Sequence, residues 1–91
     1  MKMMKAILTA LDKYELRPLV RSYGIVEEDD EIVMKPSYSH RCEVNFINGW
    51  QITLQGGATK RRSPDGEWED LGFLTIPQFG TVMEATSKFT T

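Results

Sequence analysis

Hydrophobic and polar positions alternate on both sides of the dipeptide Asn48-Gly49, over residues 42–46 and 50–54. Asn-Gly between two alternating runs is a strong signal for a β-hairpin. A two-residue loop would place the two apolar sets on opposite faces of the hairpin, whereas a three-residue loop that begins at Ile47 places both sets on one face. We therefore predict the three-residue loop, with Gly49 in the left-handed conformation that ends a type I turn with a bulge. The predicted cross-strand pairs are Cys42 with Leu54, Val44 with Ile52, and Phe46 with Trp50.

The first part of the chain has a helical pattern instead. A stripe of apolar residues at helical spacing predicts an amphipathic helix over residues 3–15. Pro18 suits the first turn of a second short helix, which would stop at Gly24. We expect a helical hairpin or a kinked helix from about residue 3 to residue 23. The members of the first stripe are Met4, Ile7, Leu8, Leu11 and Tyr14.

The rest of the chain has strand composition interrupted by turn residues. Residues 31–35 predict a strand that Pro36 ends, because proline cannot donate to a β-ladder. Residues 68–76 predict another strand, with a bulge at Gly72. The many turn residues within 55–66 predict a loop. The last two predicted segments are a short strand at 81–84 and a polar tail at 85–91.

Together these segments predict an α+β fold. With 91 residues, the chain has room for one hydrophobic core, so we predict a single domain over residues 1–91. An N-terminal helical segment, residues 1–24, packs on one face of a three- to five-stranded antiparallel sheet, residues 31–84. The polar tail at 85–91 completes the predicted domain.

Composition narrows the class of protein. The hydrophobic fraction of 41% and the charged fraction of 26% are those of an ordinary globular domain. No apolar run approaches the ~20 residues that a membrane helix needs, and the first residues lack the continuous apolar core of a signal peptide. The lone cysteine, Cys42, excludes an internal disulfide and fits a reducing compartment. We expect a cytoplasmic protein.

The net charge of −2 conceals a division along the chain. Residues 27–58 carry two basic and six acidic residues, whereas residues 1–26 carry five basic and two acidic residues. The overall charge therefore gives no general attraction to nucleic acid or to a membrane surface. One acidic run and one basic run stand out. The acidic run is Glu27, Glu28, Asp29, Asp30 and Glu31, and the basic run is Lys60, Arg61 and Arg62.

Both runs are candidates for contact with a partner. The basic run follows Gly56-Gly57 in the predicted loop, where guanidinium groups and backbone amides could hold a phosphate. Its spacing is not that of a P-loop, and a solubilising loop is the alternative. With Arg41, we expect it to contact a phosphate, a nucleotide or a protein. The acidic run lacks the spacing of a calcium loop. It is either a contact for a basic partner or a solvated connector.

Two aromatic residues, Tyr38 and Trp68, are the hardest to place in the predicted core. Tyrosine, tryptophan and arginine dominate the energetics of protein interfaces, so we predict a partner contact at these two residues. Partial burial at the sheet edge is the alternative. An edge strand could also pair with a partner or with a second copy of this chain.

The chain is poor in catalytic side chains. His40 and Cys42 would share a strand face, but a core-facing Cys42 would be inert. The two residues are also too few to hold zinc. We therefore predict no catalytic residue, no metal site and no cofactor, and a protein that is not an enzyme.

Two segments resemble part of a group of small uncharacterised accessory proteins encoded by tailed phages. They are VNFINGW at residues 44–50 and DGEWE at residues 65–69. In that group a similar strand and turn is followed, after a variable loop, by a Gly-aromatic-Glu strand. This chain departs from the group at residues 70–74, which read DLGFL, and the resemblance does not extend to the N-terminal helix. The resemblance implies an accessory protein that acts on host machinery, such as a defence system, in the host cytoplasm. It transfers no site residues.

We therefore predict a non-catalytic phage-type accessory protein that binds a host protein or protein complex and antagonises or modulates it. Two alternatives remain. One is a small-molecule binder that sequesters a nucleotide signal through residues 60–62, which predicts a homo-oligomer because so small a monomer has little volume for an enclosed site. The other is a single-stranded nucleic-acid binder, whose affinity would weaken steeply with salt.

Overall fold

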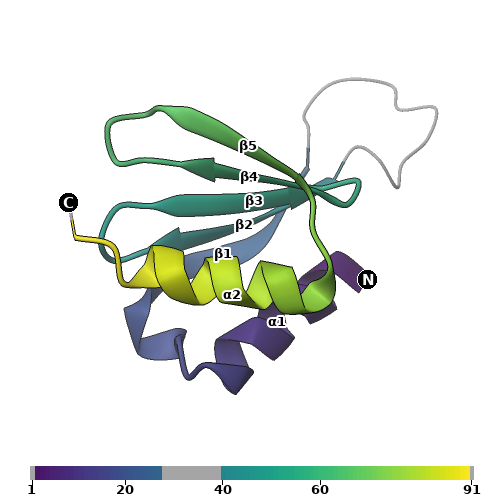
Figure 1. Ribbon diagram of the computed structural model, residues 1–91, viewed down its shortest axis with the longest axis horizontal. Helices are drawn as coiled ribbons and strands as arrows, with labels where there is room; N and C mark the ends of the chain where they lie inside the picture. The colour runs from purple at the N-terminus through teal and green to yellow at the C-terminus, as the bar shows by residue number, and fades with distance from the viewer. Residues whose placement is uncertain (1, 28–39, 91) are drawn as a thin grey trace.

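The computed structural model of the protein describes residues 2–27 and 40–90. Five antiparallel strands form one sheet in the order β1-β2-β3-β4-β5, and helices α1 and α2 lie on the same side of it (Figure 1). The predicted α+β class is thereby confirmed. The elements are α1 (Lys2–Lys13), a short 3-10 helix η1 (Arg17–Leu19), β1 (Val20–Glu27), β2 (His40–Phe46), β3 (Gln51–Gln55), β4 (Ala58–Arg62), β5 (Trp68–Phe73) and α2 (Ile76–Ser87).

The hairpin of β2 and β3 has the predicted register. Cys42 pairs with Leu54 and Val44 pairs with Ile52. The amide of Phe46 donates to the carbonyl of Trp50 at 2.9 Å, and the amide of Gly49 donates back to the carbonyl of Phe46 at 3.0 Å. Gly49 has a φ of +93°, as the predicted three-residue loop requires. The apolar side chains of the hairpin therefore share one face.

The core lies between that face and the two helices. Ile7 and Leu11 of the predicted α1 stripe are fully buried, whereas Met4 and Tyr14 are partly buried and pack against the core. Packing of the N-terminal helix on the sheet is thus confirmed. The fully or almost fully buried core residues are Ile7, Ala10, Leu11, Leu16, Cys42, Val44, Phe46, Ile52, Leu54, Phe79 and Met83.

The prediction of a second helix was wrong, because strand β1 occupies most of that segment. Only residues 17–19 form a 3-10 turn before the chain becomes extended at Val20. Tyr23 pairs with Val44 and Ile25 pairs with Cys42 in an antiparallel ladder with β2. The β-branched and aromatic residues of this segment favour that extended conformation. The helical segment predicted for residues 1–24 therefore ends at residue 19.

Strand β4 replaces most of the loop predicted at residues 55–66. Gly56 and Gly57 both have positive φ, +57° and +87°, and join β3 to β4 in a two-residue hairpin whose flanking pair is Gln55 and Ala58. The loop prediction was wrong because Gly56-Gly57 forms a tight turn between two strands and does not break the sheet.

The strand predicted at 68–76 is confirmed over residues 68–73, including the bulge, but is wrong over residues 74–76, because the chain leaves the sheet there and α2 begins at Ile76. Thr59 pairs with Gly72 while Lys60 pairs with Asp70, so Leu71 is the extra residue on β5. Gly72 has a φ of +72°, and its amide donates to Oδ1 of Asp70 at 2.9 Å. The bulge interrupts the regular pairing of this edge strand with β4.

Helix α2 overturns two further predictions, the strand at 81–84 and the polar tail at 85–91. The helix begins with a capping box, in which the Thr75 hydroxyl accepts from the amide of Gln78 and the Gln78 side chain accepts from the amide of Thr75. Thr86 and Ser87, expected in the tail, are buried against the core. The sheet therefore ends at residue 73 and not at residue 84.

The strand predicted at 31–35 lies outside the described residues. Neither α1 nor α2, the α-helices of the described part of the chain, has the length and apolar character needed to cross a bilayer.

Candidate functional site

The basic run of the sequence forms the end of β4, and strand alternation divides its side chains between the two faces of the sheet. Arg61 pairs with Ile52, a residue of the helix-covered face. Arg62 pairs with Gln51, which lies on the opposite, open face, and so does Lys60, which pairs with Thr53. The three cations predicted to act together therefore do not form one cluster.

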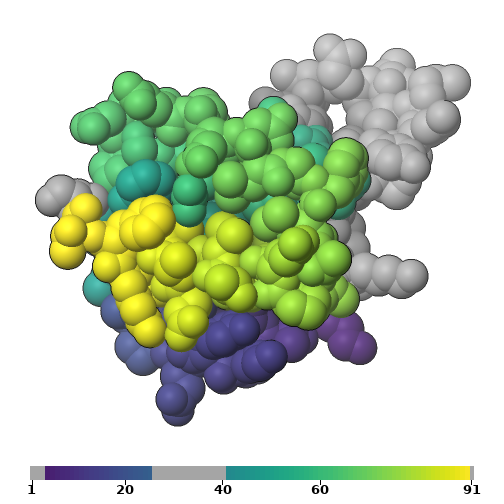
Figure 2. Space-filling model, in the orientation of Figure 1, coloured from purple at the N-terminus to yellow at the C-terminus, as the bar shows by residue number. Residues whose placement is uncertain are grey.

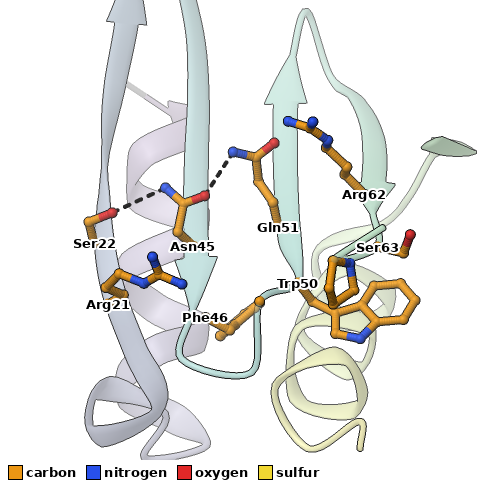
Figure 3. A pocket seen from close by; sticks show the side chains of 10 residues that line it. Arg21, Ser22, Asn45, Phe46, Trp50, Gln51, Arg62 and Ser63 are labelled. Atoms are coloured by element: carbon orange, nitrogen blue, oxygen red, sulfur yellow. Dashed lines mark hydrogen bonds between the residues drawn. The ribbon is translucent and has the colours of Figure 1, made fainter. Parts of the chain in front are cut away.

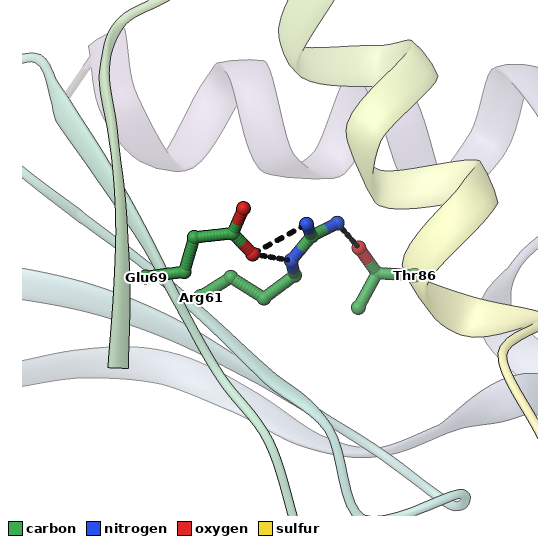
Figure 4. Close-up of polar contacts among 3 residues, drawn as sticks. All are labelled: Arg61, Glu69 and Thr86. Atoms are coloured by element: carbon green, nitrogen blue, oxygen red, sulfur yellow. Dashed lines mark hydrogen bonds and ion pairs between the residues drawn. The ribbon is translucent and has the colours of Figure 1, made fainter. Parts of the chain in front are cut away.

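Arg61 links the sheet to helix α2. Its Nη2 and Nε donate to Oε1 of Glu69 at 2.6 and 3.1 Å, and its Nη1 donates to Oγ1 of Thr86 at 3.2 Å (Figure 4). The guanidinium carbon also lies 5.6 Å from the centre of the Trp50 ring and 5.1 Å from that of Phe89. With its side chain only 16% exposed, Arg61 is held by contacts within the protein.

Arg62 and Trp68, two predicted contact residues, are brought together on the open face. They form a cross-strand pair between β4 and β5, and the guanidinium carbon of Arg62 lies 5.7 Å from the centre of the Trp68 ring. Trp68 is 51% exposed. An arginine over an exposed tryptophan presents a cationic and aromatic surface to solvent.

A hollow of about 350 Å³ lies on the open face, near the turns that join β2 to β3 and β4 to β5. We call it the polar hollow. Arg21 on β1 and Arg62 on β4 flank it from opposite sides, and their side chains extend over the strands between them (Figure 3). Its polar lining consists of Arg21, Ser22, Asn45, Gln51, Arg62 and Ser63.

Hydrogen bonds order the floor of the polar hollow. Nδ2 of Asn45 donates to Oγ of Ser22 at 3.1 Å, and Nε2 of Gln51 donates to Oδ1 of Asn45 at 2.7 Å. Nε2 of Gln51 also donates to Oε2 of Glu43 at 2.5 Å, and Nδ2 of Asn45 approaches the same oxygen at 3.4 Å. These contacts hold the amides in fixed orientations across β1, β2 and β3.

The polar hollow cannot be seen in the sequence-based prediction, because that prediction places Arg21 in a helix. In the structure Arg21 lies in β1 at an irregularity in the pairing, between Val20, which pairs with Phe46, and Ser22, which pairs with Asn45. The β-branched and aromatic composition of residues 20–26 was the signal that could have indicated a strand.

A second surface, apolar in character, lies where β5 leads into α2. Phe73 is 79% exposed and Ile76 is 68% exposed. We define the apolar surface as Phe73, Leu74, Ile76 and Pro77. It lies on the side of the molecule shown in Figure 2, at the start of α2. The predicted strand at 68–76 hid this surface, because Leu74 and Ile76 were expected to lie within a sheet.

Three shallow hollows meet at the apolar surface. The first, of about 170 Å³, is lined by Leu74 and Ile76 together with residues of the core and sheet. The second lies between α1 and α2 and is bordered by Ile76 and Pro77. The third runs along α2 beside Leu74 and Pro77. The same short segment therefore forms part of the wall of each hollow.

The remaining predicted contact residues lie elsewhere. Arg41 is a partly buried residue of β2 opposite Val26 and does not line the polar hollow. Glu27 is the last residue of β1. The other predicted contacts, which are Glu28, Asp29, Asp30, Glu31 and Tyr38, lie outside the described residues.

The one cysteine has no accessible chemistry. Cys42 is fully buried, and this burial raises the pKa of its thiol above the ordinary value of 9.0. The thiolate that nucleophilic chemistry needs is therefore disfavoured. Over residues 2–27 and 40–90, no three His, Cys, Asp or Glu side chains are grouped so that they could hold a metal ion.

Comparisons of this chain with protein-family models, with curated proteins and with solved structures gave no match. Its function must therefore be inferred from the polar hollow and the apolar surface themselves.

Proposed function

We propose that this chain is a non-catalytic binding protein that docks a partner protein on its apolar surface. The observation that carries the proposal is the exposure of Phe73 and Ile76, at 79% and 68%, within four residues of each other. Large apolar side chains exposed together mark interaction sites in soluble proteins. Burial of each in an interface removes apolar area worth roughly 1.5–3 kcal/mol.

The shape around these residues supports docking. The three hollows that meet at Leu74, Ile76 and Pro77 offer recesses for apolar side chains of the partner. The recess behind Ile76 is lined by Ala6 and Leu54 and extends to Phe79 of the core. Anchor residues that enter such recesses supply most of the binding energy in protein interfaces.

The resemblance of residues 44–50 and 65–69 to tailed-phage accessory proteins favours a host protein as the partner. On this proposal the protein would antagonise or modulate a host complex, such as a defence system, by occupying one of its surfaces. The buried Cys42 supports a role in binding and not in nucleophilic catalysis.

The test is affinity capture from extracts of candidate host bacteria, compared across variants of the full chain. Ile76→Ser and the double variant Phe73→Ser, Ile76→Ser disrupt the apolar surface. Ile47→Ser is the matched control, because Ile47 is 58% exposed on the β2–β3 turn and does not line the three hollows.

We expect at least one host protein to be retained by the wild type and by Ile47→Ser. With the purified partner, the double variant should bind at least about tenfold more weakly, which corresponds to about 1.4 kcal/mol. Equal retention of every captured protein by the wild type and the double variant would show that the apolar surface is not the docking site.

A further inference from the structure

We propose that the polar hollow binds a small organic phosphate of mononucleotide size. This site is separate from the apolar surface and does not depend on the protein-binding role. Four features support it: two guanidinium groups, the distance between the strands that carry them, an ordered polar floor, and the charges on the neighbouring part of the sheet.

The two guanidinium groups are suited to an anion. Guanidinium binds phosphate through two parallel hydrogen bonds and retains its charge at every physiological pH. Arg17 is paired with Asp12 and Arg61 with Glu69, each through a short ion pair. Within the described part of the chain, Arg21 and Arg62 form no such pair with a carboxylate. Their charges are therefore directed to solvent on the two sides of the polar hollow.

The separation of the strands that carry these groups indicates the size of the ligand. Arg21 and Arg62 start from β1 and β4, which are three strand spacings apart, or about 14 Å. An inorganic phosphate ion is much smaller than this span, whereas a mononucleotide can place its phosphate on one guanidinium and its base on the other. The volume of about 350 Å³ lies within the roughly 300–1,000 Å³ typical of small-molecule sites.

The floor offers both donors and acceptors to the rest of such a ligand. The Ser22 hydroxyl accepts from Asn45 and so keeps its own proton for donation into the hollow. Gln51 donates through Nε2 to Asn45 and Glu43, which leaves its Oε1 as an acceptor. Ser63 accepts from the amide of Glu67 and likewise retains a hydroxyl proton. Mixed donors and acceptors match the edge of a base or a ribose better than a second phosphate.

The charges on the adjacent row of the sheet favour one small ligand over a polymer. Across the open face, the row beside the hollow carries the carboxylates of Glu43 and Asp70 with a single ammonium group, that of Lys60. A nucleic-acid strand that continued across this face would bring its phosphates against two carboxylates. The polar hollow is thus a local cationic site and not part of a basic track.

Calorimetric titration of the full chain tests the proposal, with AMP, GMP, CMP and UMP as ligands. Inorganic phosphate, adenosine and a single-stranded oligonucleotide serve as comparisons. We expect saturable binding of at least one monophosphate, tighter than that of phosphate or of the nucleoside. In ¹H–¹⁵N spectra the side-chain amides of Asn45 and Gln51 should shift during the same titration.

Three variants locate the site. Arg21→Gln and Arg62→Gln should each weaken binding by roughly tenfold, because each removes a charge-assisted pair of hydrogen bonds. Lys60→Gln removes a cation from the same strand and face as Arg62 but outside the hollow, and it should change the affinity by less than about threefold. All three side chains are exposed or at the surface, and thermal melting confirms that each variant is folded.

Several outcomes would overturn the proposal. One is the absence of saturable binding by all four monophosphates. Another is an affinity for inorganic phosphate, adenosine or the oligonucleotide that equals or exceeds the affinity for every monophosphate. The last is a loss of affinity in Lys60→Gln as large as that in Arg21→Gln and Arg62→Gln. Because the apolar surface is not involved, loss of the protein-binding proposal would leave this result unchanged, and the reverse also holds.

Discussion

Arg61 and Arg62 are adjacent in the sequence, yet they lie on opposite faces of the sheet. Arg61 pairs with Ile52 and reaches Thr86 of α2, whereas Arg62 pairs with Gln51 and lines the polar hollow. One position therefore contributes to the contact between the sheet and α2, and the next lines the hollow that we propose as a ligand site.

This division predicts different effects of the same substitution. Arg61→Gln should lower the free energy of unfolding by about 2 kcal/mol, because it removes the hydrogen bonds to Glu69 and Thr86 from a largely buried position. Arg62→Gln should cost about 0.5 kcal/mol or less, since it removes only a contact with the exposed Trp68 ring. Urea denaturation of both variants gives the comparison. Equal losses of stability would contradict the structural role of Arg61.

The β2–β3 turn predicts a specific need for glycine. Gly49 has a φ of +93°, and a Cβ at this position would lie 3.1 Å from the side chain of Pro64. Gly49→Ala should therefore destabilise the protein by about 1–3 kcal/mol. Gly24→Ala is the control, because a Cβ at Gly24 would meet nothing within 4 Å and Gly24 does not have a positive φ. Thermal melting should show a clear loss for the first variant and no loss for the second.

The contact between the helices predicts a coupling between Gly80 and Tyr14. A Cβ at Gly80 would lie 2.9 Å from Cε2 of Tyr14, so α2 approaches α1 closely because position 80 has no side chain. In a Tyr14→Ala background, Gly80→Ala should stabilise the protein by up to about 1 kcal/mol, because alanine favours helix. In the wild type the clash should cancel that gain. A double-mutant cycle from denaturation data measures the difference, and additive effects would contradict the proposed contact.

The buried thiol predicts both slow modification and a dependence of stability on pH. Because burial raises the pKa of Cys42 in the folded state, the protonated thiol stabilises the fold below the ordinary pKa of 9.0. That contribution is lost as the pH rises from 9.0 through the folded-state pKa. Stability of the wild type should therefore fall in this alkaline range more than that of Cys42→Ala.

A thiol reagent at about pH 8 should react slowly with the native protein and rapidly in denaturant. Rapid reaction of the native protein would show that Cys42 is exposed.

The β2–β3 hairpin could be predicted from the sequence because two independent signals agree on it. Asn48-Gly49 marks the turn, and the alternating residues at 42–46 and 50–54 select the register that buries both apolar sets. The same reasoning identified the amphipathic stripe of α1. Where the pattern of burial and the local turn chemistry agree, the register follows.

Two of the errors, at β4 and α2, arose where a segment has weak intrinsic preference. Residues 58–62, ATKRR, carry few strand formers, and their strand exists because Thr59 and Arg61 pack on the helix side. Helix α2 contains Gly80 and several β-branched residues, which lower helix propensity. Its capping box, with Thr75 three residues before Gln78, was the signal that could have identified the helix.

The candidate sites were harder to predict than the fold. Trp68 and Arg62 were expected to contact a partner, and the structure brings them together on the open face. Arg21, which lies across the polar hollow from them, belongs to β1, where the sequence pattern predicts a helix. The apolar surface exists because the chain leaves the sheet after residue 73. A predicted strand that continues to residue 76 keeps these residues in the sheet and so does not reveal the surface.

The order of the strands has a consequence for the synthesis of this protein on the ribosome. Each strand pairs with its neighbour in sequence, so the sheet can assemble hairpin by hairpin as the chain emerges. Phe79 and Met83 come later, on α2, and they complete the core that Ile7 of α1 begins. A nascent chain that ends at β5 therefore exposes the apolar face of the sheet, because α2 is not yet there to cover it. We expect it to need a chaperone until residue 87 has left the exit tunnel.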